Sequence, residues 1–129
     1  MPVITLSNPP AVRAPGTRYS HAALVEGARR RLVISGQVGV EPDGTVPATA
    51  EGQIAQACAN LRAVLEAHGM GPADVVKVTA FLTDRALIPA YRAAREAMFA
   101  DHASASTLLV VAGLADPRWV VEIEAEAAQ

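Results

Sequence analysis

Hydrophobic and polar residues follow a two-residue period in several stretches of the chain. Residues 75–83 alternate and are rich in β-branched side chains, and in residues 119–127 apolar positions alternate with three glutamates. Residues 107–112 form a denser apolar run, and residues 21–26 and 31–35 are two shorter ones. Because successive side chains of a strand point to opposite faces, these stretches predict β-strands.

Two other stretches have the three- and four-residue spacing of a helix. After Thr49, apolar residues recur at helical spacing until Gly69, which predicts an amphipathic helix ending at that glycine. Thr49 is placed to cap this helix, and Gln53 lies near the capping-box position. A second helix is expected from about residue 87 to Ala100, with Pro89 acceptable in its first turn.

The connecting segments contain the residues that turns require. Residues 8–17 hold three prolines and a glycine, which predicts an irregular arm after a short first strand. The runs 21–26 and 31–35 are separated by residues 27–30, and this spacing predicts that they pair as a hairpin. Two nearby glycines in residues 35–39 indicate a bulge or a close approach of two backbones.

The resulting order of elements is β-β-β-α-β-α-β-β, which predicts an α+β fold rather than a doubly wound sheet. Two helices cover one face of such a sheet, so the other face needs cover or must be polar. Residues 108–111 are apolar on both faces. A second apolar face in so short a chain favours an oligomer.

Length and composition narrow the class of protein. The chain has 129 residues, which suits a single domain over residues 1–129, with 51% apolar and 19% charged residues. Its net charge of -2 argues against nucleic acid as a partner, because phosphate binding needs a concentrated basic surface. We see no signal peptide in the first residues and no apolar run near the ~20 residues that span a membrane. We therefore expect a soluble, cytoplasmic protein without a membrane partner.

Several kinds of site are not expected. Cys58 is the one cysteine, so no intrachain disulfide forms, and its place on the apolar stripe favours a buried hydrophobe over a nucleophile. The three histidines lack metal-ligand spacing. No dinucleotide, P-loop or nucleophile-elbow fingerprint occurs. The sequence thus implies no metal and no cofactor.

Four blocks, in order, give the chain a family resemblance. They are Ser35–Gly39 (SGQVG), Gln56–Leu61 (QACANL), Asp74–Asp84 (DVVKVTAFLTD) and Val121–Ala125 (VEIEA). Together these blocks resemble the RidA/YjgF family. The resemblance implies a chorismate-mutase-like α+β fold and a homotrimer with three clefts between neighbouring subunits. It also implies hydrolysis of reactive enamines and imines, such as 2-aminoacrylate, to oxo acids and ammonia.

The chain departs from this family at one position. Members carry an arginine that grips the substrate carboxylate just before the penultimate strand, and Ser106 stands there in the stretch Ser104–Thr107. A serine hydroxyl cannot neutralise a carboxylate. Arg92, at a helix position near the family cleft, is a candidate for the missing charge. The alternative is that Arg92 is a solvated helix residue.

The resemblance also assigns further cleft residues. Glu124 matches the glutamate that positions the attacking water, although it also suits the polar face of an ordinary strand. Tyr19, Ser35 and Gly36 match positions that line the cleft. Packing would equally explain Tyr19, and a bulge would explain Ser35 and Gly36. His21 is either an acid or base near neutral pH or a hydrogen-bonded structural residue.

Two hypotheses about function follow. In the first, the chain is a hydrolase of enamines or imines with altered specificity, in which Ser106 and Tyr19 shape the pocket. In the second, it is a non-catalytic small-molecule-binding or interaction trimer that keeps the scaffold without the chemistry. The serine at position 106 is the feature that favours the second hypothesis.

Overall fold

The computed structural model describes residues 3–129. The expectation of no signal peptide rests in part on residues 1–2, which lie outside the described residues. The order of strands and helices predicted from the sequence is confirmed. The elements are β1 (Ile4–Ser7), β2 (Ala22–Val25), β3 (Arg31–Val38), α1 (Ala50–Ala67), η1 (Pro72–Asp74), β4 (Val75–Leu82), η2 (Arg85–Leu87), α2 (Ile88–Phe99), β5 (Ala105–Val110) and β6 (Val121–Ala128).

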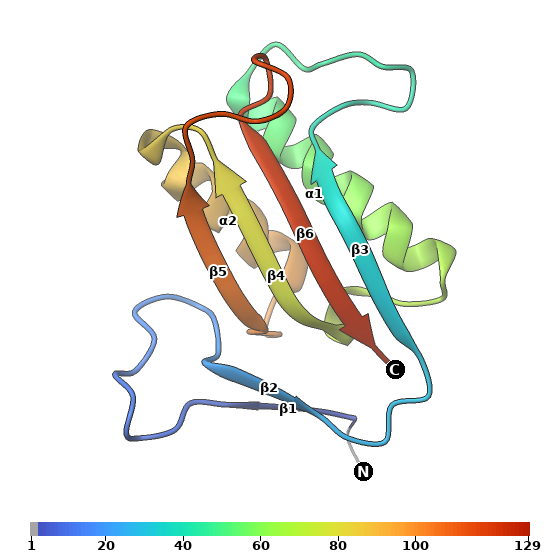
Figure 1. Cartoon of the computed structure of the whole chain (residues 1–129), viewed down its shortest axis with the longest axis vertical. Coiled ribbons are helices and arrows are strands. Elements are labelled where there is room, and N and C mark those ends of the chain that lie inside the picture. The colour runs from blue at the N-terminus through green and yellow to red at the C-terminus, as the bar shows by residue number, and fades with distance from the viewer. Residues whose placement is uncertain (1–2) are drawn as a thin grey trace.

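Four strands form one sheet in the order β3-β6-β4-β5, so β3 and β5 are its two edges. β6 runs antiparallel to both of its neighbours, whereas β4 and β5 are parallel and are joined through α2. Both helices pack on one face of this sheet, as Figure 1 shows. The predicted α+β class, with two helices on one side, is confirmed.

The predicted hairpin between residues 21–26 and 31–35 is wrong. β2 pairs with β1 instead, in the antiparallel register that joins Ile4 to Val25 and Ser7 to Ala22. The link to β3 is held elsewhere, because the backbone N–H groups of Arg29 and Arg30 donate to the carbonyl of Gln129 at 2.9 and 3.0 Å. This link carries the chain to the end of β6, which becomes the partner of β3.

The start of α1 confirms one expectation and corrects another. Thr49 caps the helix, since its Oγ1 accepts from the N–H of Gly52 at 3.0 Å. Gln53 does not complete a capping box. Its buried amide donates to the carbonyl of Arg118 at 2.9 Å and accepts from the N–H of Val120 at 3.0 Å. Gln53 therefore satisfies backbone groups of the β5–β6 loop that would otherwise be buried without partners.

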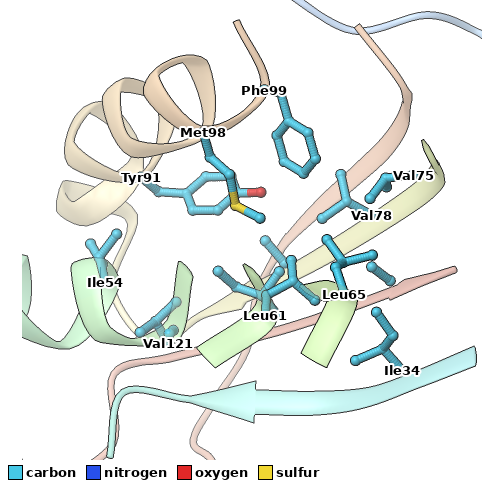
Figure 2. Packing of buried hydrophobic residues seen from close by; sticks show 14 of the residues in the cluster. Ile34, Ile54, Leu61, Leu65, Val75, Val78, Tyr91, Met98, Phe99 and Val121 are labelled. Atoms are coloured by element: carbon cyan, nitrogen blue, oxygen red, sulfur yellow. The ribbon is translucent and has the colours of Figure 1, made fainter. Parts of the chain in front are cut away.

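The core lies between the helices and the sheet, and Figure 2 shows its packing. α1 contributes Ile54, Leu61 and Leu65 at the predicted helical spacing. Cys58 is packed against this cluster, and burial raises the pKa of its thiol to about 11. A thiol with this pKa stays protonated near neutral pH, which agrees with its interpretation as a packing residue.

In the described part of the chain, residues 3–129, no helix covers the opposite face of the sheet (Figure 1). Three glutamates of β6 alternate with buried residues and project from this face. Beside them, Val33 of β3 is 65% exposed and Leu109 of β5 is 44% exposed. This outer face thus combines carboxylates with apolar side chains that a single chain leaves in water.

Candidate functional site

A β-bulge lies in the middle of β3, as the two glycines predicted. Ile34 pairs with Ala125 and Gln37 with Ile123, so Ser35 and Gly36 together stand opposite a single residue, Glu124. A bulge of this kind adds one residue to one strand and bends it locally. It sets the Ser35–Gly36 backbone against the carboxylates of β6.

Glu122 approaches this bulge more closely than the sequence indicated. Its carboxylate occupies the space beside the α-carbon of Gly36, where any β-carbon would overlap with it. Glu122 is half-buried, and it lines a hollow with Phe81 and Leu114. Glu124 is exposed and lines a different hollow, beside Lys77.

The sequence missed Glu122 because alternation places both glutamates on the same face of β6. The four-block resemblance likewise contains both residues in its VEIEA segment. What separates them is the bulge, which shifts the register of β3 against β6 by one residue. Gly36 was the available signal, since glycine is the residue that permits such close approach.

Three of the predicted residues lie together at the other edge of the sheet. Tyr19, Arg92 and Ser106 line one open pocket. The same pocket is lined by Thr17, His21, Arg95, Thr107 and Leu108. Arg92 therefore lines the same pocket as Ser106, the position at which the family pattern has an arginine and this chain does not.

The arm before β2 is held in place over this pocket. Ser20 is buried and forms a parallel bridge with Ala105, and its N–H donates to the carbonyl of Ser104 at 3.1 Å. This bridge places Tyr19 and His21 beside the start of β5. The two rings meet edge to face, with their centroids 5.6 Å apart.

His21 has a structural hydrogen bond in this arrangement. Its Nε2 lies 2.6 Å from the carbonyl oxygen of Arg13. The contact ties the ring to the proline-rich arm. His21 thus lines the pocket with one ring nitrogen already engaged, which agrees with the structural alternative for this residue.

The pocket is basic on its helix side. Arg92 and Arg95 are three residues apart on α2, a spacing that places both on one face of the helix. Arg92 is exposed, whereas Arg95 is only 6% exposed. Arg95 stands at helical spacing from the buried residues Tyr91 and Phe99, which was the available signal, but the sequence predicted no role for it in the site.

The predicted site residues therefore form two separate groups. Ser35, Gly36 and Glu124 lie on the outer face at β3 and β6, and the pocket of Tyr19 and Ser106 lies at β5 and α2. Because β3 and β5 are opposite edges of the sheet, one chain does not bring the two groups together.

Neither a cluster of metal-ligating side chains nor a membrane-spanning helix occurs among the described residues. Within residues 3–129, no group of three or more His, Cys, Asp or Glu side chains is arranged to hold a metal ion. In the same residues, every helix is too short or too polar to cross a membrane.

Comparison with known proteins identifies the relatives of this chain. Residues 10–129 match the family model described as endoribonuclease L-PSP. A 2-iminobutanoate/2-iminopropanoate deaminase of Escherichia coli K12 is 38% identical over 72 residues, which are 55% of this chain and 56% of that protein. A deaminase of the same name from Rattus norvegicus is 37% identical over 84 residues, covering 64% and 57%. The matches thus span little more than half the length of these curated relatives.

Solved structures match nearly the whole chain. A Rid-family protein of Yersinia pestis has a TM-score of 0.88 at 29% identity, and the match covers 98% of this chain and 99% of that one. The YjgF gene product of Escherichia coli has a TM-score of 0.71 at 33% identity, with 97% and 98% covered. The chain therefore belongs to the endoribonuclease L-PSP family, that of the RidA/YjgF proteins.

Proposed function

We propose that this protein hydrolyses 2-imino acids and their enamine tautomers, in clefts between the subunits of a homotrimer. Water adds across the C=N bond, the C–N bond of the resulting carbinolamine breaks, and the products are a 2-oxo acid and ammonia. Relatives named 2-iminobutanoate/2-iminopropanoate deaminase support this reaction class. The net charge of -2 argues against RNA as the substrate, because phosphate binding needs a concentrated basic surface.

The observation that carries the proposal is the separation of the site into two groups at opposite edges of the sheet. Two complementary surfaces on different sides of a chain can join head to tail between copies, and such contacts form a ring when the rotation between copies closes. Each contact then sets the bulge of one copy, with Ser35 and Gly36, against the pocket of Tyr19, Arg92 and Ser106 on the next. The exposed apolar residues of the outer face support burial in the same contact.

Each group has a separate task in this mechanism. Arg92 attracts the substrate carboxylate, and Tyr19 and Ser106 shape the pocket around the imine. A carboxylate of β6 accepts the proton of the attacking water. Glu124 is the residue expected from the sequence, and the geometry favours Glu122, because it is half-buried against Gly36 while Glu124 is exposed.

The test is ammonia release from freshly generated 2-iminobutanoate and 2-aminoacrylate. We expect release above the buffer rate with the wild-type protein, and a faster rate with Ser106→Arg, which restores the arginine of the family pattern. The proposal would be contradicted if the wild type released ammonia at the buffer rate and Ser106→Arg released it no faster. That outcome would favour the non-catalytic binding trimer.

A further inference from the structure

The guanidinium of Arg95 is buried without a counter-ion. Its side chain is 6% exposed, and its Nε has no hydrogen-bond partner. Nη2 donates to Thr17 Oγ1 at 3.5 Å, which is a long contact. Within residues 3–129, the ion pairs join Arg31 to Glu126 and Arg118 to Asp116, so no carboxylate compensates this charge.

A charge in this position is costly for the folded chain. Arginine does not lose its proton in proteins, so the group cannot escape the cost by becoming neutral. Burying an uncompensated ion is strongly unfavourable. The ring of Tyr91, whose centroid is 6.0 Å from Arg95 Cζ, offers only a weak cation–π contact. An anion from outside the chain would compensate this charge.

The surroundings of Arg95 indicate which anion fits. Arg95 and Ser106 both line the open pocket of Tyr19 and both line a smaller hollow, so Arg95 borders two hollows that share these residues. Among the described residues, none that lines the open pocket is acidic, and the exposed residue Arg92 adds a second cation. Glu96 lines the smaller hollow without forming an ion pair with Arg95.

Hydroxyl groups complete this environment. Thr17, Tyr19 and Ser106 line the open pocket and provide neutral hydrogen-bonding groups beside the two arginines, whereas the Thr107 hydroxyl already accepts from Lys77 Nζ at 2.6 Å. A planar guanidinium donates two parallel hydrogen bonds, a geometry that matches a carboxylate. The pocket thus provides the buried guanidinium of Arg95, the exposed guanidinium of Arg92 and several hydroxyl groups. This combination suits a small carboxylic acid.

We propose that Arg95 binds the carboxylate of a small 2-oxo or 2-imino acid and so replaces, from helix α2, the arginine that the family pattern places at Ser106. This assignment rests on the proposed function, because it takes that function's pocket as the substrate site. The positive charge that the family pattern places on strand β5 is then supplied by helix α2. The small side chain of Ser106 leaves space for the carboxylate beside Arg95. Arg92 then serves as an outer cation that attracts the acid.

Titration with pyruvate tests the assignment in four proteins: wild type, Arg95→Met, Arg95→Lys and the control Arg85→Met. Arg85 is exposed and lies outside the pocket. We expect Arg95→Met to weaken pyruvate binding by about 10- to 100-fold, the effect of losing charge-assisted hydrogen bonds. Arg95→Lys keeps the positive charge but loses the paired N–H donors of the guanidinium, so its affinity for pyruvate should be intermediate. Ser106→Arg added to Arg95→Met should restore binding.

A thermal measurement separates this role from a structural one. Because Arg95→Met removes an uncompensated buried charge, its melting temperature without ligand should equal or exceed that of the wild type. Pyruvate should raise the melting temperature of the wild type and not that of the variant. Should Arg95→Met fail to fold, Arg95→Lys decides, and an unchanged affinity in this variant overturns the assignment.

Two results overturn the inference: a wild-type protein that does not bind pyruvate, and a folded Arg95→Met protein that binds it as the wild type does. Failure of the proposed function looks different. In that case the wild type binds pyruvate through Arg95 but releases no ammonia from 2-iminobutanoate, and the carboxylate site stands without the reaction.

Discussion

The carboxylate of Glu122 occupies the space that a β-carbon at Gly36 would fill. The contact joins the centre of β3 to the start of β6, and it exists because the bulge at Ser35 and Gly36 shifts the register of the two strands. Glycine at this position thus determines where an acidic group stands on the outer face. The bulge in β3 thus bears on which carboxylate of β6 is placed to accept a proton in the proposed cleft.

Replacing Gly36 with alanine should move this carboxylate without unfolding the chain. The overlapping atoms belong to the end of the Glu122 side chain, which can rotate away. We expect ammonia release from 2-iminobutanoate to fall by about 10- to 100-fold, as for other displaced catalytic groups. Gly71→Ala is the control, because open space surrounds Gly71. An unchanged rate in Gly36→Ala, together with a loss in Glu124→Gln, would assign the proton acceptor to Glu124.

Arg92→Ala should weaken the attraction of anionic ligands to the pocket. Arg92 is exposed at its edge, so its contribution is screened by salt. We expect pyruvate affinity to fall by about two- to tenfold at low salt and by less at high salt, as for exposed charges. Calorimetric titration at the two salt concentrations measures this difference. Equal affinity in the variant and the wild type would identify Arg92 as a solvated helix residue.

Charged residues at Val33 or Leu109 should separate the subunits. Both side chains are exposed on the outer face, and burying a charge between two copies is unfavourable. We expect Val33→Glu and Leu109→Glu to sediment as folded monomers, whereas the wild type sediments as a trimer. Val12→Glu, on the exposed proline-rich arm, should remain a trimer. A wild-type protein that is a folded monomer in dilute solution would remove the shared clefts altogether.

Gln53→Leu should destabilise the fold. The substitution leaves the carbonyl of Arg118 and the N–H of Val120 without their part-buried hydrogen bonds to the side chain of Gln53. Leaving a buried polar group unpaired costs about 1–3 kcal/mol, so we expect the free energy of unfolding in urea to fall by at least this amount. The exposed residue Glu66 supplies the control variant Glu66→Gln, which should unfold like the wild type.

Stability should decrease at alkaline pH because of two buried groups. Burial raises the pKa of Cys58 from 9.0 to about 11 and that of Tyr91 from 10.0 to about 12. The unfolded chain therefore loses these protons at lower pH than the folded chain, and stability falls as the pH rises from about 9 towards 11 and 12. Urea unfolding at increasing pH measures the slope. Cys58→Ala should flatten its lower part, and a profile identical to that of the wild type would contradict this cause.

The sequence by itself determined the elements and their types. Helical spacing of apolar residues located α1, and strand alternation located β4 and β6, because both patterns depend on which side chains face a core. The cap at Thr49 was likewise readable, since its hydrogen bond joins residues three positions apart. Periodic patterns and short-range hydrogen bonds involve residues that are close together in the sequence, so the sequence alone is enough to predict them.

Tertiary structure decided which strands pair and which functional groups meet. β2 pairs with β1 and not with β3, and the link between β2 and β3 is hydrogen-bonded to Gln129, at the far end of the chain. The choice between Glu122 and Glu124 depends on a one-residue shift at the bulge, and the buried charge of Arg95 depends on the arm that covers it. These relationships join residues far apart in the chain, and the energy of packing them, rather than any local preference, selects one arrangement.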